Sequence, residues 1–180
     1  AEACDVLGEA LGLSKEERKT LYLAARVHDI DKKIEIESDH WNSEGQKEQY
    51  KIKEEILRNS GYSQDIINLT KVTGWEALPK FLSKEERTLP EEIIHYADDI
   101  TSEREVVLLR ERILNSLRKP HVKKLSKEGM KIYQGKSFSR VAYPVSAKIE
   151  AKFAEKLGIK DPKTLPNYIN RKIEERIEKF

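Results

Sequence analysis

Two stretches of the sequence place residues that can bind a metal beside residues typical of a buried helix. His28 and Asp29 follow the mainly apolar residues 23–27, and Asp98 and Asp99 follow a core-like run at residues 93–97. Neutral imidazole and carboxylate are the commonest ligand types for divalent transition metals. A carboxylate buried without a cation is costly, so these positions call for a partner. The pattern predicts a metal site.

The spacing of the His28-Asp29 doublet restricts where it can act. Adjacent residues of a helix point about 100° apart, so the doublet can reach one ion only near a helix end or beside a groove. A third ligand must come from another helix, and Asp98 is the candidate. A structural alternative is a hydrogen-bonded pair at a helix C-terminus, where the helix dipole favours protonated His28. Asp98 and Asp99 could likewise pair with Arg104 or a lysine.

The periodicity of the chain predicts a single all-α domain that positions these residues. A capping box, Ser14 to Glu17, opens the helix that leads to the doublet. Pro90 suits the first position of a long helix that carries Asp98. A loop is expected at 75–89, and no alternating strand pattern of useful length appears. Helices are expected over residues 1–12, 14–33, 43–61, 63–74, 91–118, 121–134, 145–157 and 166–179.

The composition excludes several classes of protein. The chain has 180 residues, of which 38% are hydrophobic and 37% charged. Its single cysteine, Cys4, rules out an internal disulfide and a multi-cysteine zinc site, and is expected to be buried and inert. No stretch approaches the roughly 18 to 20 apolar residues that span a bilayer, and no signal peptide is visible. A soluble, cytoplasmic protein without a membrane partner is expected.

The charge is distributed unevenly along the chain. Residues 1–100 carry 14 Lys and Arg against 22 Asp and Glu, whereas residues 101–140 carry 11 against 4 and residues 141–180 carry 9 against 6. The basic part can meet phosphates of a nucleotide or a nucleic acid. The alternative is a solvated helix face, or pairing with the acidic half. We expect a helical domain at 1–118 and a basic helical C-terminal extension at 119–180 that packs on it.

The stretch "LYLAARVHDIDKK", together with "IIHYADDIT" about seventy residues later, resembles the HD-domain superfamily of metal-dependent phosphohydrolases. The resemblance covers about residues 1–115. It implies an HD-like helical bundle in which His28, Asp29 and Asp98 bind the metal. The family's first histidine would fall a few residues before Ala1. The implied activity is metal-dependent hydrolysis of a nucleotide or a small phosphate ester.

The resemblance also implies roles for neighbouring residues. Asp29 and Asp99 would be catalytic, and Lys32 and His40 would contact the substrate. The cofactor would be one divalent ion of Mn, Fe, Co, Ni, Zn or Mg. His95, three residues before Asp98, is expected to serve packing or to orient a ligand.

The sequence departs from the family pattern at two places. The family's "HDIGK" reads "HDIDK" here, with Asp31 in place of glycine and Lys32 kept. Members that bind two metals add two histidines between the doublet and the last aspartate. Only His40 lies in that interval, and "TKVTGW" stands where the second would fall, so a two-metal site is not expected.

These departures leave other functions open. One is a degenerate HD domain that binds a nucleotide or a protein as a regulatory module without catalysis. Another is a two-iron oxygenase, against which the missing second histidine argues. Nucleic-acid binding by the basic C-terminal part is a secondary hypothesis. The sequence does not indicate an oligomeric state.

Overall fold

The structure is a computed structural model that describes most of the chain. The described residues are 1–32, 43–73, 77–83, 86–102, 105–119, 122–123, 130, 133 and 135–179. They are mostly helical, which confirms the all-α prediction. The predicted helix at 121–134 lies largely outside the described residues, and so does His40.

The first two helices begin and end where the sequence signals place them. Helix α1 (Glu2–Ala10) is followed by Gly12, whose φ of +85° only glycine adopts readily. Helix α2 (Lys15–Val27) begins with the predicted capping box, in which Ser14 and Glu17 bond reciprocally. It ends at Val27, six residues before the predicted end at residue 33. The His28-Asp29 doublet therefore follows a helix instead of lying within one.

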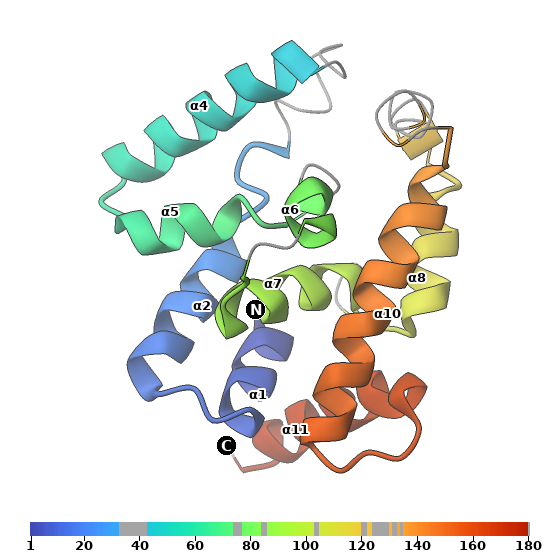
Figure 1. Ribbon diagram of the computed structural model, residues 1–180. Coiled ribbons are helices and arrows are strands. Elements are labelled where there is room, and N and C mark those ends of the chain that lie inside the picture. The colour runs from blue at the N-terminus through green and yellow to red at the C-terminus, as the bar shows by residue number, and fades with distance from the viewer. Residues whose placement is uncertain are drawn as a thin grey trace.

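Three helices follow α2 along the chain, of which α5 packs on α2 and α4 packs on α5 (Figure 1). Their bounds are Ser43–Asn59 for α4, Gln64–Thr70 for α5 and Leu78–Leu82 for α6. The turn between α4 and α5 contains Gly61 at a φ of +81°, at the predicted helix end. The predicted loop at 75–89 is wrong in part, because Leu78 and Phe81 are buried and form the short helix α6.

The predicted long helix at 91–118 is interrupted. Helix α7 (Leu89–Ile100) has Pro90 in its first turn, as expected, and a capping box at Thr88. The chain then forms a hairpin of β1 (Thr101–Ser102) and β2 (Glu105–Val106) before α8 (Leu109–Ser116). β-Branched residues in this stretch favour extended backbone. The break turns α8 to a new direction beside the C-terminal part of the chain.

The C-terminal helices differ from prediction mainly in length. Helix α10 (Phe138–Lys156) begins seven residues before the predicted 145 and contains Pro144 in its interior. A 3₁₀ turn, η2 (Pro162–Thr164), leads to α11 (Leu165–Ile177). Helix α10 packs on α7 and α8, while α11 packs on α1. The division of the chain at residue 118 stays a prediction.

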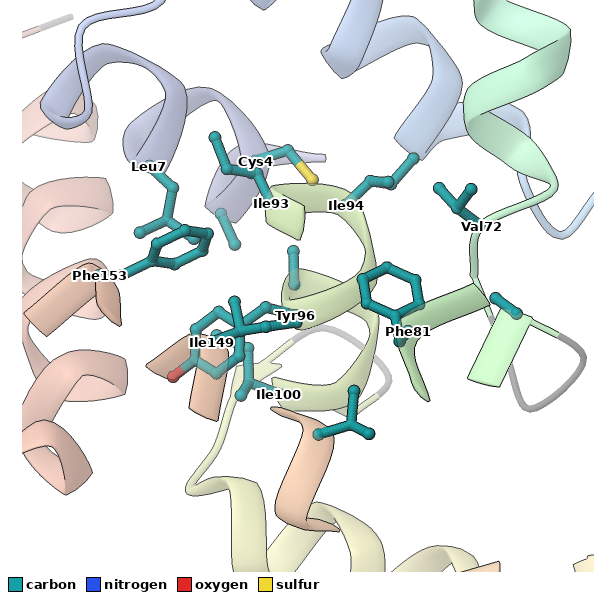
Figure 2. Close-up of a cluster of buried hydrophobic side chains, with 14 of the residues drawn as sticks. Cys4, Leu7, Val72, Phe81, Ile93, Ile94, Tyr96, Ile100, Ile149 and Phe153 are labelled. Atoms are coloured by element: carbon teal, nitrogen blue, oxygen red, sulfur yellow. The ribbon is translucent and has the colours of Figure 1, made fainter. Parts of the chain in front are cut away.

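Helix α7 lies at the centre of the hydrophobic core (Figure 2). On one side, Tyr96 meets Phe153 of α10 edge-to-face, with ring centroids 5.9 Å apart. On the other side, Ile94 faces the N-terminal helices, and Phe81 of α6 lies beside α7. Cys4 is buried in the same core, and burial raises the pKa of its thiol to about 12, as expected for an inert cysteine. Among the described residues, no helix has the length and apolar character needed to cross a membrane.

A cluster of ion pairs ties the two ends of the described chain together. Asp5 of α1 accepts hydrogen bonds from Arg18 of α2 at 2.8 Å and from Arg176 of α11 at 2.6 Å. Arg176 also bonds Glu9. The Arg18 hydrogen bond and the neighbouring Arg176 hold the pKa of Asp5 below its usual range, despite partial burial.

We predict that Arg176→Met lowers the free energy of unfolding at pH 7 by about 1–2 kcal/mol. Because the folded-state pKa of Asp5 is depressed, its contribution is present above pH ~4 and is lost as the pH falls through that lowered pKa. The difference between the wild type and the variant should therefore shrink in acid, as measured by urea unfolding across a pH series. Arg171→Met, on the same helix and 64% exposed, is the matched control and should change stability little. An equal loss in both variants would contradict the assignment.

Candidate metal centre

The doublet lies in a tight turn at the C-terminal end of α2. His28 still has helical backbone angles, and the chain then turns through residues 28–31. The amide of Ile30 donates to the Val27 carbonyl at 3.1 Å, and the amide of Lys32 donates to the Asp29 carbonyl at 3.0 Å. At this helix end His28 Nε2 and Asp29 Oδ2 lie 3.5 Å apart, so the two adjacent side chains approach each other.

His28 is the hub of the cluster that the sequence predicts. Its Nδ1 lies 2.9 Å from the Ala25 carbonyl, which fixes the proton on Nδ1 and leaves the lone pair of the neutral ring on Nε2. Nε2 lies 3.4 Å from Asp98 Oδ1 and 3.5 Å from Asp29 Oδ2. Nε2 is buried and has no hydrogen-bond partner of good geometry. Helices α2 and α7 thus bring His28, Asp29 and Asp98 together.

The charges of this cluster act on one another. Burial lowers the pKa of His28, but contact with Asp98 and the charges of Asp98 and Asp29 outweigh it and raise that pKa to about 8. Burial raises the pKa of Asp98, yet the contact with His28 outweighs it and holds that pKa well below its usual range. In the absence of another cation, a proton on Nε2 therefore balances the two carboxylates.

The three side chains are of the types that bind a divalent cation, and both distances from His28 fit one. Two ligand atoms about 2.1 Å from a metal, at a tetrahedral angle, are about 3.4 Å apart. The two distances from His28 Nε2 match this separation. Fixing Nδ1 by a backbone carbonyl is also how proteins orient metal-binding histidines. Among the described residues, no group of three or more His, Cys, Asp and Glu side chains forms a ready-made metal site, so the cluster consists of two contacts that share His28.

The three side chains differ in their access to solvent. The Asp29 side chain is 59% exposed, whereas those of His28 and Asp98 are 21% and 25% exposed. The cluster therefore lies at the surface of the hydrophobic core. The Asp98 carboxylate of α7 is on its more buried side, and the Asp29 carboxylate is on its solvent side. A ligand from solvent would meet Asp29 first.

A buried ion pair holds the turn that carries the doublet. Lys53 of α4 donates to the His28 carbonyl at 2.6 Å and lies 3.0 Å from Asp31 Oδ1. The Asp31 and Lys53 side chains are only 6% and 10% exposed. Burying both charges is favourable only because each has a close partner. Lys53 thus connects the middle of α4 to the backbone of His28. Sequence reasoning missed Lys53, because nothing in a helix of many lysines marks one as buried.

A second histidine and aspartate lie behind the first pair. His95 stacks on Phe81 at 3.9 Å between centroids, and its Nδ1 lies 2.9 Å from the Val72 carbonyl. Its Nε2 lies 3.7 Å from Asp99 Oδ2, which accepts a hydrogen bond from Ser146 of α10. Burial raises the pKa of Asp99. These contacts favour a packing role for His95, and they place Asp99 against α10. Asp99 as a catalytic residue stays a prediction.

The remaining predicted residues are less closely tied to the cluster. The Lys32 ammonium lies 3.9 Å from Asp29 Oδ1, and its side chain is 45% exposed. It lies near enough to contact an anion held beside Asp29. His40 lies outside the described residues. Arg112 of α8, which sequence reasoning did not single out, donates to the Thr101 carbonyl at 2.5 Å and contributes positive charge near both Asp98 and Asp99.

We predict that Lys53→Met lowers the free energy of unfolding by about 3 kcal/mol, because it removes the cation that lies 3.0 Å from the buried Asp31 carboxylate. Adding Asp31→Asn should recover part of the loss, since it removes the charge that Lys53 faces. Urea unfolding of both single variants and the double variant measures the coupling. Lys51→Met, exposed on the same helix, is the control. If the changes in unfolding free energy caused by Asp31→Asn and Lys53→Met were strictly additive, the two residues would not act as a unit.

Comparisons with protein-family models, with curated proteins and with solved structures give no match. The resemblance to the HD-domain superfamily therefore rests on the doublet, on the "AD" dipeptide that ends at Asp98, and on their separation along the chain. The contacts at His28 are accordingly the basis for assigning a function.

Proposed function

We propose that this protein is a metal-dependent phosphohydrolase that acts on a nucleotide or another small phosphate ester. The observation that carries the proposal is the buried Nε2 of His28, which faces two carboxylates without a hydrogen-bond donor between them. Such a convergence of acceptor atoms is balanced either by a proton on Nε2 or by a bound cation. One divalent ion of Mn, Fe, Co, Ni, Zn or Mg, held by His28, Asp29 and Asp98, would be such a cation.

A bound divalent ion would supply Lewis acidity toward a phosphate oxygen and would lower the pKa of water. The residues of the chain do the rest. His28 gives an imidazole whose orientation is set by the Ala25 carbonyl. Asp98 gives a carboxylate that stays ionised at neutral pH, because its pKa is held low. Asp29, as the most exposed ligand, is the group that an incoming water or substrate reaches, and it can accept a proton there.

The surroundings of the cluster favour a phosphate over a neutral substrate. Two carboxylates balance a divalent cation, so the loaded site is close to neutral and does not repel an anion. The flexible ammonium of Lys32, beside Asp29, can then contact a phosphate oxygen as a point charge. These residues favour a phosphate as the reacting group of the substrate. They do not identify the rest of the substrate.

We predict that protein purified without chelator contains one of these metals near one equivalent, or takes up Mn²⁺ or Ni²⁺ when it is added. His28→Ala and Asp98→Asn should lower the metal affinity at least 100-fold, because each removes a central ligand. Elemental analysis and calorimetric titration measure this. Asp65→Asn, exposed on α5, is the control for a lost carboxylate. Wild-type protein that binds no metal, even after addition, would refute the metal centre.

We predict further that the metal-loaded protein releases phosphate from p-nitrophenyl phosphate or nucleoside monophosphates. His28→Ala, Asp29→Asn and Asp98→Asn should each lower kcat/KM by at least 100-fold, whereas Asp65→Asn should stay within about twofold. Phosphate release is measured with Mn²⁺ or Ni²⁺ present and with chelator added. Metal binding without turnover of any phosphate ester would favour the second candidate function, a binding or regulatory module with an HD-like fold.

A further inference from the structure

Helices α8 and α10 lie side by side (Figure 1). Side chains of both helices line an open groove of about 700 Å³, a volume within the range of small-molecule sites. Apolar side chains from both helices form most of its lining: Leu108, Leu109, Ile113, Leu114, Tyr143 and Pro144. Leu108 and Leu114 are 37% and 48% exposed, so they present apolar surface to solvent. Exposed apolar side chains that line a cavity of this size indicate a ligand.

The charged residues of the groove are mostly positive. Arg110, Arg140 and Lys163 are exposed at its walls, and within the described residues none of the three forms an ion pair. The one carboxylate of the lining, Glu150, is buried and accepts a hydrogen bond from the Tyr96 hydroxyl at 2.8 Å. The positive charge of Lys163 also acts on that carboxylate. The groove therefore combines an apolar lining with the guanidinium groups of Arg110 and Arg140, which form no ion pair within the described residues.

We propose that this groove binds a small amphiphile with an unbranched apolar chain and a carboxylate head, of the class of long-chain fatty acids. The leucines and Ile113 receive the chain, and the head pairs with the guanidinium of Arg110 or Arg140, which match a carboxylate by two parallel hydrogen bonds. Charge complementarity distinguishes this occupant from a neutral lipid.

Both walls of the groove also touch the helix that carries Asp98. Ser146 of α10 donates to Asp99, and Glu150 of α10 accepts from Tyr96. On α8, Arg112 donates to the Thr101 carbonyl at the end of α7. A ligand that separates α8 from α10 would strain these contacts, and so would change the affinity of the metal centre. This coupling rests on the proposed function, whereas binding in the groove does not.

Titration with a fluorescent 18-carbon polyenoic acid tests the groove directly in the metal-free full chain. We expect saturable binding at one site, at least tenfold tighter than for the alcohol of the same chain. Arg110→Glu combined with Arg140→Glu should remove the preference for the acid, and Leu114→Asp should weaken binding of both compounds at least tenfold. Lys160→Glu, exposed and outside the groove, should change neither.

Three results would overturn the proposal. The first is binding that occurs only above the concentration at which the acid forms micelles. The second is an equal affinity for the acid and the alcohol, and the third is an unchanged affinity in Leu114→Asp. Uptake onto phosphatidylglycerol vesicles without binding of the monomeric acid would also overturn it and would indicate a membrane surface instead. Repeating the titration with and without saturating Mn²⁺ tests the coupling, because a linked site must shift both affinities by the same factor. No shift would refute the coupling alone, and it would leave the groove and the metal centre to their own tests.

Discussion

The structure depends on helix α7, which carries two adjacent carboxylates to the edge of a hydrophobic core. Neither Asp98 nor Asp99 can lie there without a partner, because desolvation of an unpaired carboxylate costs several kcal/mol. Their partners come from different helices: His28 from the end of α2 and Ser146 from α10. Neighbouring residues on a helix point in different directions, so the two aspartates require packing on two sides of α7. The N-terminal and C-terminal halves of the chain meet around this helix.

His28 and His95 have the same arrangement and differ in the exposure of their side chains. In each ring Nδ1 meets a backbone carbonyl, and the buried Nε2 faces a carboxylate without a good hydrogen bond. His95 is 2% exposed and stacks on Phe81, which favours a packing role. The His28 side chain is 21% exposed and has the solvent-facing Asp29 beside it, which favours a chemical role.

Local signals in the sequence predict most of the fold, because helix ends are set by nearby residues. The capping box at Ser14 and the glycines at 12 and 61 act within a few residues, and the structure confirms them. The failures come from interactions between distant residues. The interruption of the predicted helix at 91–118 depends on a hairpin that packs on α11. Asn170 of α11 donates a hydrogen bond to the Val106 carbonyl of this hairpin. The contacts of His28 with Asp29 and Asp98 could be predicted because these residue types at the ends of apolar runs need a partner, whereas Lys53 has no such mark in the sequence.

The aspartate that departs from the family motif is compensated within the same turn. Glycine at position 31 would leave the turn to be held by its backbone alone, whereas Asp31 brings in a buried charge that Lys53 neutralises. The same ammonium donates to the His28 carbonyl, so the added side chain strengthens the position of the doublet. A residue that breaks a motif without a partner would argue for loss of function. Here the partner is present, and it fixes the backbone of His28, on which the proposed metal centre depends.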